Sequence, residues 1–211
     1  YTKFEAYNIN DVIYHFNCNN KQLVIKLRTI KELITMTTIR IATIEDAEAI
    51  TEIYKPYVLN TTITFELDPP TVDEMRHRIL HTLEKYPYLV AEEEGKVIGY
   101  AYAGTLYDRR AYDHSAELSI YIHKDKRHGG VGHLLYNALI DYLKKMNITN
   151  LYGCITYPNP ASISFHEKYG FKEAAHFHEC GYKFDQWLDV VYLEKKLPKT
   201  TEPFKPFKEI C

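Results

Sequence analysis

Apolar residues follow two different periods along this chain. A repeat of three to four residues, typical of amphipathic helices, predicts helices over residues 44 to about 60, after a cap at Thr71, over 131 to about 146 and over 161–169. Runs rich in β-branched and aromatic residues predict strands over 37–42, 89–93, 96–103, 116–122, 151–156, 171–179 and 187–194. Because strands and helices alternate, the pattern predicts an α/β fold with a mixed central β-sheet flanked by helices on both faces.

Capping and turn residues support these boundaries. Thr43 with Asp46, and Thr71 with Glu74, have the spacing in which a hydroxyl and a carboxylate satisfy the free backbone N–H groups at a helix start. Gly95 lies in an acidic turn between two predicted strands, which is typical of a hairpin.

Composition changes at Met36. Residues 1–35 contain no glycine, proline or methionine, and about half of them are Asn, Ile, Lys or Tyr, so turn signals are missing there. We expect residues 1–35 to be an N-terminal extension outside the fold, 36–197 to form the domain and 198–211 to be an extended tail rich in Lys and Pro. A natural helical extension over residues 22–34 is the alternative for the first segment.

Bulk composition is that of an ordinary globular domain. The 211 residues are 45% hydrophobic and 26% charged, with a net charge of −2. A net charge this close to zero does not indicate a nucleic-acid-binding surface, so no nucleic-acid partner is expected. No apolar run approaches the roughly 20 residues that span a bilayer, so no membrane partner is expected either. The cysteines, Cys18, Cys154, Cys180 and Cys211, lack C-x-x-C spacing, which favours reduced thiols in a cytoplasmic protein.

A glycine-rich run, Arg127-His128-Gly129-Gly130-Val131-Gly132, joins a predicted strand to a predicted helix. Glycine permits positive φ and lets a ligand approach the backbone, and the first turn of a helix offers free N–H groups to an anion. The spacing is neither that of a phosphate-binding NTPase loop nor the first-strand signature of a dinucleotide fold. A pyrophosphate group fits such a turn, and an ordinary glycine-rich helix start is the alternative.

A second constellation is Asn159-Pro160-Ala161-Ser162-Ile163-Ser164-Phe165-His166-Glu167-Lys168-Tyr169-Gly170-Phe171. It resembles the late motif of the GNAT superfamily of N-acetyltransferases, and the glycine run resembles the R-x-x-G-x-G loop with which that superfamily binds the acetyl-CoA pyrophosphate. Residues 86–92, 101–104, 109–113, 116–117 and 187–190 resemble the phosphinothricin N-acetyltransferase subgroup. The resemblance runs from about Ile39 to the tail and leaves residues 1–35 uncovered.

The resemblance implies a GNAT fold with acetyl-CoA as co-substrate. It implies that the cofactor is held along one strand, the glycine run and the late motif. The implied residues are Ser119, Ile120, Tyr121, Ile122, Arg127, His128, Gly129, Gly130, Val131, Gly132, Asn159 and Ser162.

Acetyl transfer to an amine needs a base, because an amine with a pKa of about 9 to 10 is mostly protonated at pH 7. Glu117 is the candidate base. It lies mid-strand between apolar neighbours, where desolvation raises a carboxyl pKa, and it matches the position of the family's proposed base. A glutamate on a solvated strand face is the alternative. We expect the developing oxyanion to bind strand amides near residues 119–122.

His166 is the second catalytic candidate. Many GNAT members carry a tyrosine there, as the acid that protonates the leaving thiolate, whereas the phosphinothricin subgroup resembles this chain in having histidine. A histidine titrates near neutral pH and could relay protons or contact the substrate. A histidine merely hydrogen-bonded on its helix is the alternative. Tyr169 could instead supply the acid or belong to the core.

Arg109 and Tyr112 match positions that the subgroup uses for substrate recognition. A guanidinium suits bidentate capture of an amino-acid carboxylate, although loop arginines are commonly only solvated. Phe65 matches a loop near the acceptor pocket and could wall that pocket or belong to the core. The subgroup resemblance also implies a homodimer.

Histidines raise the question of a metal. His176, His178 and Cys180 alternate along one predicted strand face, and His123, His128 and His133 surround the glycine run. No fourth ligand with finger-like spacing accompanies them, so we expect no metal.

The sequence therefore predicts an acetyl-CoA-dependent N-acetyltransferase for the α-amine of a small amino-acid-like acceptor, such as phosphinothricin or methionine sulfoximine. Direct attack in a ternary complex is expected, because no cysteine has a recognisable histidine partner. The alternatives are a CoA-binding regulatory module without turnover, and an acetyltransferase for protein N-termini or polyamines. Arg109 and Arg110 favour an anionic acceptor over a polyamine.

Overall fold

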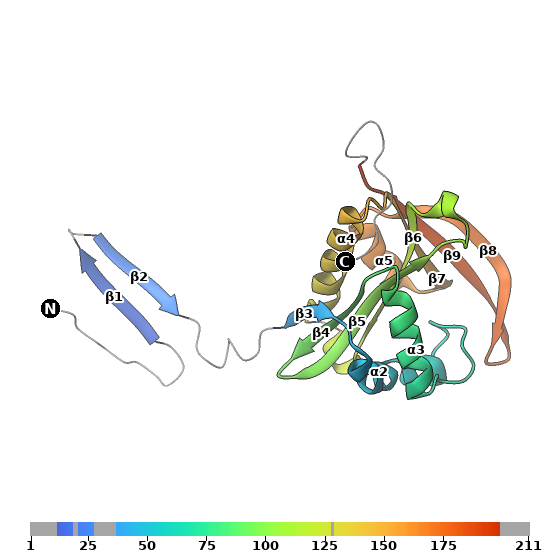
Figure 1. Cartoon of the computed structure of the whole chain (residues 1–211), viewed down its shortest axis with the longest axis horizontal. Helices are drawn as coiled ribbons and strands as arrows, with labels where there is room; N and C mark the ends of the chain where they lie inside the picture. Colours follow the sequence, from blue (N-terminus) through green and yellow to red (C-terminus); the bar gives the residue numbers. More distant parts are fainter. Residues whose placement is uncertain (1–11, 19–20, 28–36, 128, 199–211) are drawn as a thin grey trace.

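The computed structural model describes residues 12–18, 21–27, 37–127 and 129–198. Seven of the described strands form one mixed sheet, in the order β3-β4-β5-β6-β7-β9-β8 (Figure 1). The strands are β3 (Thr38–Ile41), β4 (Tyr88–Glu93), β5 (Lys96–Thr105), β6 (Ser115–Ile122), β7 (Asn150–Tyr157), β8 (Lys172–Lys183) and β9 (Gln186–Lys196). The described α-helices are α2 (Ala47–Asn60), α3 (Val72–Leu83), α4 (Val131–Lys145) and α5 (Pro160–Lys168), with short 3₁₀ turns η1 (Ile44–Asp46), η2 (Arg110–Tyr112) and η3 (Lys124–Lys126).

The sheet combines two antiparallel halves at one parallel step. Strands β3 to β6 pair antiparallel in sequence order, β6 then pairs parallel with β7, and β7, β9 and β8 pair antiparallel. A parallel neighbour requires a crossover, and the chain makes it through α4. The predicted mixed sheet is confirmed.

Helices cover both faces of the sheet (Figure 1). Leu135 of α4 belongs to the same buried cluster as Leu89 of β4, whereas Ile50 of α2 belongs to a second cluster that contains Val90. Leu89 and Val90 are successive residues, and successive side chains of a strand point to opposite faces. α4 therefore covers one face and α2 with α3 covers the other, as predicted. No helix in the described part of the chain is long and apolar enough to cross a membrane.

Both predicted helix starts are capped as expected. The Asp46 carboxylate accepts the Thr43 N–H at 2.8 Å and pairs with Arg40 at 2.7 Å. The Thr71 hydroxyl accepts the Glu74 N–H at 3.2 Å. The first of these segments begins as the 3₁₀ turn η1 and becomes α-helical only at Ala47.

The N-terminal segment contains two further strands, β1 (Val12–Cys18) and β2 (Lys21–Leu27), which pair with each other in a sheet of their own. The alternative of a helix over residues 22–34 is wrong for residues 22–27, which belong to strand β2. The Leu-Val-Ile run in this segment favours a strand. Residues 28–34 and the tail residues 199–211 lie outside the described residues. Neither β1 nor β2 joins the seven-stranded sheet, and the boundary at Met36 stays a prediction.

Strand β8 is longer than predicted and ends at a buried lysine. Its pairing with β9 shifts register between Phe177 and Gly181 and then continues to Lys183. The Lys183 side chain is only 2% exposed, and its ammonium donates to the Val58 carbonyl at 2.7 Å and the Thr64 carbonyl at 2.8 Å. Lys183 thus ties β8 to the end of α2 and to the loop that follows it.

Candidate active site

The parallel strands β6 and β7 pair only over their first residues and then diverge. Their pairs run from Ser115 with Asn150 to Glu117 with Tyr152, after which β6 continues to pair with β5 and β7 with β9. A cavity of about 60 Å³ lies in the opening. It is lined by Ile63, Leu118, Ser119, Ile120, Tyr121, Gly153, Cys154, Ile155, Asn159, Ser162 and His166. Six predicted site residues are thereby brought together, namely Ser119, Ile120, Tyr121, Asn159, Ser162 and His166.

Alternate backbone groups of β6 face this opening. On the β5 side the His123 N–H donates to the Ile98 carbonyl at 2.8 Å, so His123 belongs to a hydrogen-bonded pair of the β5–β6 ladder. In an antiparallel ladder the neighbouring residues turn their N–H and C=O groups the other way. By this alternation the backbone groups of Leu118, Ile120 and Ile122 point toward β7, whereas those of residues 119 and 121 point toward β5.

Tyr57 of α2 occupies one of these backbone positions. The Ile122 N–H donates to Tyr57 Oη at 3.3 Å, and Oη donates to the Ile122 carbonyl at 2.6 Å. The Ile122 amide is therefore engaged within the chain, and the amides of Leu118 and Ile120 face the opening. The expectation that amides near residues 119–122 bind an oxyanion stays a prediction. The same Tyr57 ring also lies 5.0 Å from the Arg127 guanidinium, so one residue fixes both the strand end and the glycine loop.

His166 is buried at the base of α5, with one ring nitrogen engaged and the other free. The side chain is 4% exposed, and Nδ1 lies 2.8 Å from the Ser162 carbonyl, so Nδ1 carries the proton. Nε2 has no hydrogen-bond partner among the residues that the structure describes. A Cβ on Gly153 would lie 3.0 Å from Nε2, so the glycine makes room for the ring. Burial lowers the His166 pKa, which favours the neutral imidazole. In that form Nε2 is a hydrogen-bond acceptor in the wall of the cavity.

Tyr169, the alternative acid, is not among the residues that line the cavity. Its hydroxyl donates to the His133 carbonyl at 3.3 Å and lies 3.1 Å from His133 Nδ1, and its ring packs against Tyr136 and Phe165. Burial raises its pKa. Tyr169 therefore links α5 to α4, and the geometry favours His166 over Tyr169 as the group that faces the reaction.

Glu117 lies on β6 at the last residue before the strands part. Its carboxylate is half-buried and accepts a hydrogen bond from Tyr192 Oη of β9 at 3.3 Å. Burial raises the pKa of Glu117, and the Tyr192 hydrogen bond partly offsets that rise. This is the environment expected of a carboxylate that accepts a proton near neutral pH.

Sequence reasoning missed Tyr192 and Cys154. They are register partners on β9 and β7, and the Tyr192 hydroxyl also interacts with the Cys154 thiol, whose pKa is raised by burial. Burial likewise raises the pKa of Tyr192, so it stays a hydrogen-bond donor. Tyr192 is 75 residues from Glu117, and no local spacing signals a contact that depends on three adjoining strands.

The glycine loop forms the start of α4. Gly130 has a φ of +78°, in the left-handed region that favours glycine, and no described side chain caps the helix. The first-turn amides and the positive end of the helix dipole are thus open to an anion. Gly132 differs, because a Cβ there would make only ordinary contacts, at 3.6 Å from the Phe165 ring and 3.8 Å from Ile120, so the packing alone does not require a glycine. His128 lies outside the described residues.

The three predicted acceptor residues are outside the lining of this cavity. Arg109 precedes η2, which Tyr112 ends, and both side chains are exposed in the connection between β5 and β6. Tyr112 packs edge-on against Tyr107 at 5.0 Å. Phe65 lies so close to β8 that a Cβ on Gly181 would meet its ring at 2.1 Å. Ile63, two residues before Phe65, does line the cavity.

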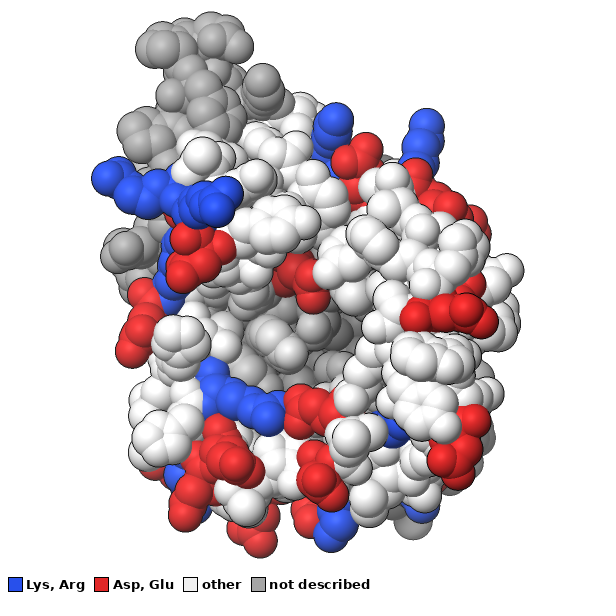
Figure 2. Space-filling model, turned by 90° about the vertical axis from the view of Figure 1, so that its right-hand side faces the viewer, with Lys and Arg blue, Asp and Glu red and all other residues white. Residues whose placement is uncertain are grey.

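Figure 2 shows the face of the molecule that carries β8 and the loop after α2. It has a central hollow, with acidic side chains at its rim and basic side chains between them. Arg78 of α3 and Glu66 of the loop after α2 form an ion pair, with atoms 2.7 Å apart.

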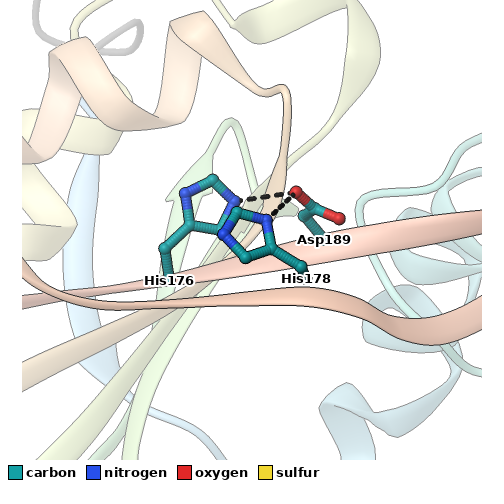
Figure 3. A group of neighbouring side chains, drawn as sticks. All are labelled: His176, His178 and Asp189. Atoms are coloured by element: carbon teal, nitrogen blue, oxygen red, sulfur yellow. Dashed lines mark hydrogen bonds and ion pairs between the residues drawn. The ribbon is translucent and has the colours of Figure 1, made fainter.

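One group of side chains in the described part of the chain could hold a metal ion, and it lies on β8 and β9 (Figure 3). It contains His176 and His178, as the sequence suggested, but its third member is Asp189 and not Cys180. The register shift after Phe177, with Glu179 at a φ of +47°, breaks the alternation that would have placed Cys180 beside the histidines.

Comparison with known proteins agrees with this geometry. The family model described as an acetyltransferase (GNAT) domain matches residues 39–192. Phosphinothricin N-acetyltransferase of Alcaligenes faecalis is 38% identical over 76% of this chain and 82% of its own length. The L-methionine sulfoximine/L-methionine sulfone acetyltransferase of Salmonella typhimurium is 34% identical over 79% of this chain and 98% of its own.

Solved structures give the same result. A phosphinothricin acetyltransferase from Sinorhizobium meliloti, determined in complex with acetyl-CoA, has a TM-score of 0.76 and 34% identity over 82% of this chain and 94% of its own. The fold is thus that of an acyl-CoA-dependent acyltransferase. The chain belongs to the GNAT acetyltransferase family and is an N-acetyltransferase. The predicted family, fold and enzyme class are confirmed, as is acetyl-CoA as the co-substrate of this class.

Replacing Gly130 with valine should weaken acetyl-CoA binding at least about tenfold, because a β-branched residue resists φ of +78° and displaces the amides of the loop. Gly95→Val is the matched control, since Gly95 has a φ of +75° in the turn between β4 and β5. Calorimetric titration with acetyl-CoA measures both. Equal affinities in two folded variants would contradict the assignment of the loop.

Proposed function

We propose that this enzyme transfers the acetyl group of acetyl-CoA to the α-amine of a small amino-acid-like acceptor of the phosphinothricin or methionine sulfoximine type. The names of the relatives from A. faecalis and S. typhimurium support this acceptor class. The observation that carries the proposal is Glu117, a half-buried carboxylate with a raised pKa at the point where β6 and β7 part.

The residues present fit acetyl-CoA. The uncapped start of α4 suits the pyrophosphate, and the diverging strands offer the backbone groups of Leu118 and Ile120 to an extended amide-containing arm. His166 Nε2, buried and without a partner among the described residues, is a free acceptor beside this site. Asn159 caps α5 by accepting the Ser162 N–H at 3.1 Å and so holds the late motif in place.

The proposed reaction balances as follows. Glu117 takes one proton from the substrate ammonium, and the freed nitrogen attacks the thioester carbon. A β6 amide stabilises the oxyanion while the C–S bond breaks. The second proton, lost by the acylated nitrogen, goes to the departing thiolate, with neutral His166 as the group that can pass it on. Burial keeps the Cys154 thiol protonated, which argues against a covalent acetyl-enzyme.

Acceptor recognition is assigned to the edge of the site. Arg109 stands on the connection that leads into β6 and would hold the acceptor carboxylate, with Tyr112 beside it. Phe65 would wall the opposite margin, held there by Lys183 and the close approach to Gly181. This arrangement favours an anionic acceptor over a polyamine.

We also propose a homodimer in the cytoplasm. Four large aromatic side chains of β8, β9 and their turn are exposed, namely Phe177, Tyr182, Phe184 and Trp187. An apolar surface of this kind on one strand pair suits a second copy of the chain. The described cysteines Cys154 and Cys180 are unpaired, consistent with a reducing compartment. Light scattering at working concentration measures the assembly.

The domain proposal is that residues 36–197 fold without residues 1–35. It rests on the separate pairing of β1 with β2. A chain that starts at Met36 should keep the melting temperature and acetylation rate of the full chain. A large loss of either would assign the first segment a structural role.

The acceptor class is tested with a thiol-release assay on purified enzyme. Phosphinothricin, methionine sulfoximine and other amino acids should release CoA, whereas a polyamine or a peptide N-terminus should release little. Turnover that is faster with spermidine than with any amino acid would overturn the proposed acceptor. Binding of acetyl-CoA without turnover on any amine would instead indicate a regulatory module.

Glu117→Gln should lower turnover by about 10²–10⁴-fold, the usual effect of losing a general base, while acetyl-CoA affinity is kept. The defect should shrink as pH rises toward the amine's own pKa, where free amine no longer needs the base. Glu167→Gln, an exposed glutamate of α5, is the control. Wild-type kcat/KM at pH 7 in Glu117→Gln, with chemistry limiting the rate, would exclude Glu117 as the base.

Tyr192→Phe should raise the pKa of Glu117 further, because the lost hydrogen bond stabilises the carboxylate. A base must be ionised to act, so the acid limb of the kcat/KM profile should move to higher pH and the plateau should change less. Tyr152→Phe on the adjoining strand is the control. An unchanged acid limb in Tyr192→Phe would show that Tyr192 does not act on the base.

A further inference from the structure

The β8–β9 pair carries a convergence of three side chains away from the residues assigned to acetyl transfer (Figure 3). His176 Nε2 lies 2.9 Å from Asp189 Oδ2, and His178 Nδ1 lies 3.0 Å from the same oxygen. The three ligand atoms all lie within 4.8 Å of one another. Two imidazole nitrogens and one carboxylate oxygen thus point at one small volume.

The backbone explains why they meet. His176 and His178 are two residues apart on a strand, so their side chains share a face, and their rings stack with centroids 4.3 Å apart. Asp189 comes from the neighbouring strand and is oriented by the Glu179 N–H, which donates to Oδ1 at 2.8 Å. That hydrogen bond engages Oδ1 and leaves Oδ2 to the histidines.

We propose that His176, His178 and Asp189 bind a divalent transition-metal ion, Zn²⁺ by preference. Neutral imidazole and carboxylate are the ligands that Zn²⁺ takes at about 2.0–2.2 Å, with water filling the remaining position of a tetrahedron. Tetrahedral ligands at that distance stand about 3.3 Å apart, so the present 2.9 and 3.0 Å separations need to open by a few tenths of an ångström. His178 is well exposed, so its ring can make that adjustment and leave room for water.

The ion would brace the strands beside the acetyl-CoA opening without entering the chemistry. The His176 ring lies 4.9 Å from the ring of Tyr157, the last residue of β7, and Asn159 of the late motif follows two residues later. A cation bound between β8 and β9 would therefore stabilise the strand pair that backs this motif. Glu117 and His166 are not among its ligands.

Calorimetry with ZnCl₂ tests the site on the full chain, expressed without a histidine tag and dialysed against chelator. We expect one Zn²⁺ per chain with a dissociation constant of about 10 μM or tighter. His178→Gln and Asp189→Asn should weaken binding at least about tenfold, because the first removes an imidazole ligand and the second removes the negative charge of the carboxylate ligand. His81→Gln, an exposed histidine on α3, is the matched control and should bind as the parent does.

Two results would overturn the site: no saturable Zn²⁺ binding by the parent chain, or equal affinity in the parent and His178→Gln. Asp189→Asn also disturbs the bond to Glu179, so its fold is checked by circular dichroism, whereas the exposed His178 can be changed without that concern. Zn²⁺ should raise the melting temperature of the parent and of His81→Gln but not of His178→Gln. Acetylation by the chelated enzyme is a separate readout, so failure of the metal site leaves the proposed function untouched.

Discussion

The separation of β6 from β7 after Glu117 is the constraint on which the rest of the site depends. Paired strands satisfy each other's backbone groups, so a sheet that stayed closed would have no amides to offer a ligand. The opening is tolerated because each strand keeps its other neighbour, β5 for β6 and β9 for β7. It also admits the late motif on α5 and makes a wall from residues of both strands.

Burial around this opening acts on every titratable group in the same direction, against its charged form. It raises the pKa of Glu117 and of the Cys154 thiol and lowers that of His166. The consequences differ by group: the carboxylate becomes a better base, the thiol a poorer nucleophile and the imidazole a neutral acceptor. A single physical cause thus favours direct transfer over a covalent intermediate.

Strand β8 holds the loop that follows α2 in place. Lys183 would be costly to bury without its two carbonyl partners, and with them it fastens the loop that carries Phe65. Earlier on β8, next to the register shift, His176 and His178 meet Asp189 of the neighbouring strand β9. The hairpin therefore carries Lys183 near its turn and the candidate metal ligands in the bulged region, and its large aromatic side chains are exposed.

Local features of the sequence determined the helices, most strands, both capping boxes and the glycine loop, because each depends on residues within a few positions of one another. The late motif likewise placed His166, Asn159 and Ser162 at the cavity. Tertiary structure alone decided the rest. Tyr192 donates a hydrogen bond to Glu117, 75 residues away in the sequence, and Tyr57 accepts the N–H of Ile122, 65 residues away. The bulge in β8 makes Asp189, and not Cys180, the third member of the histidine cluster. Strand register and bulges set these contacts, and a one-residue change of register reverses which side chains share a face.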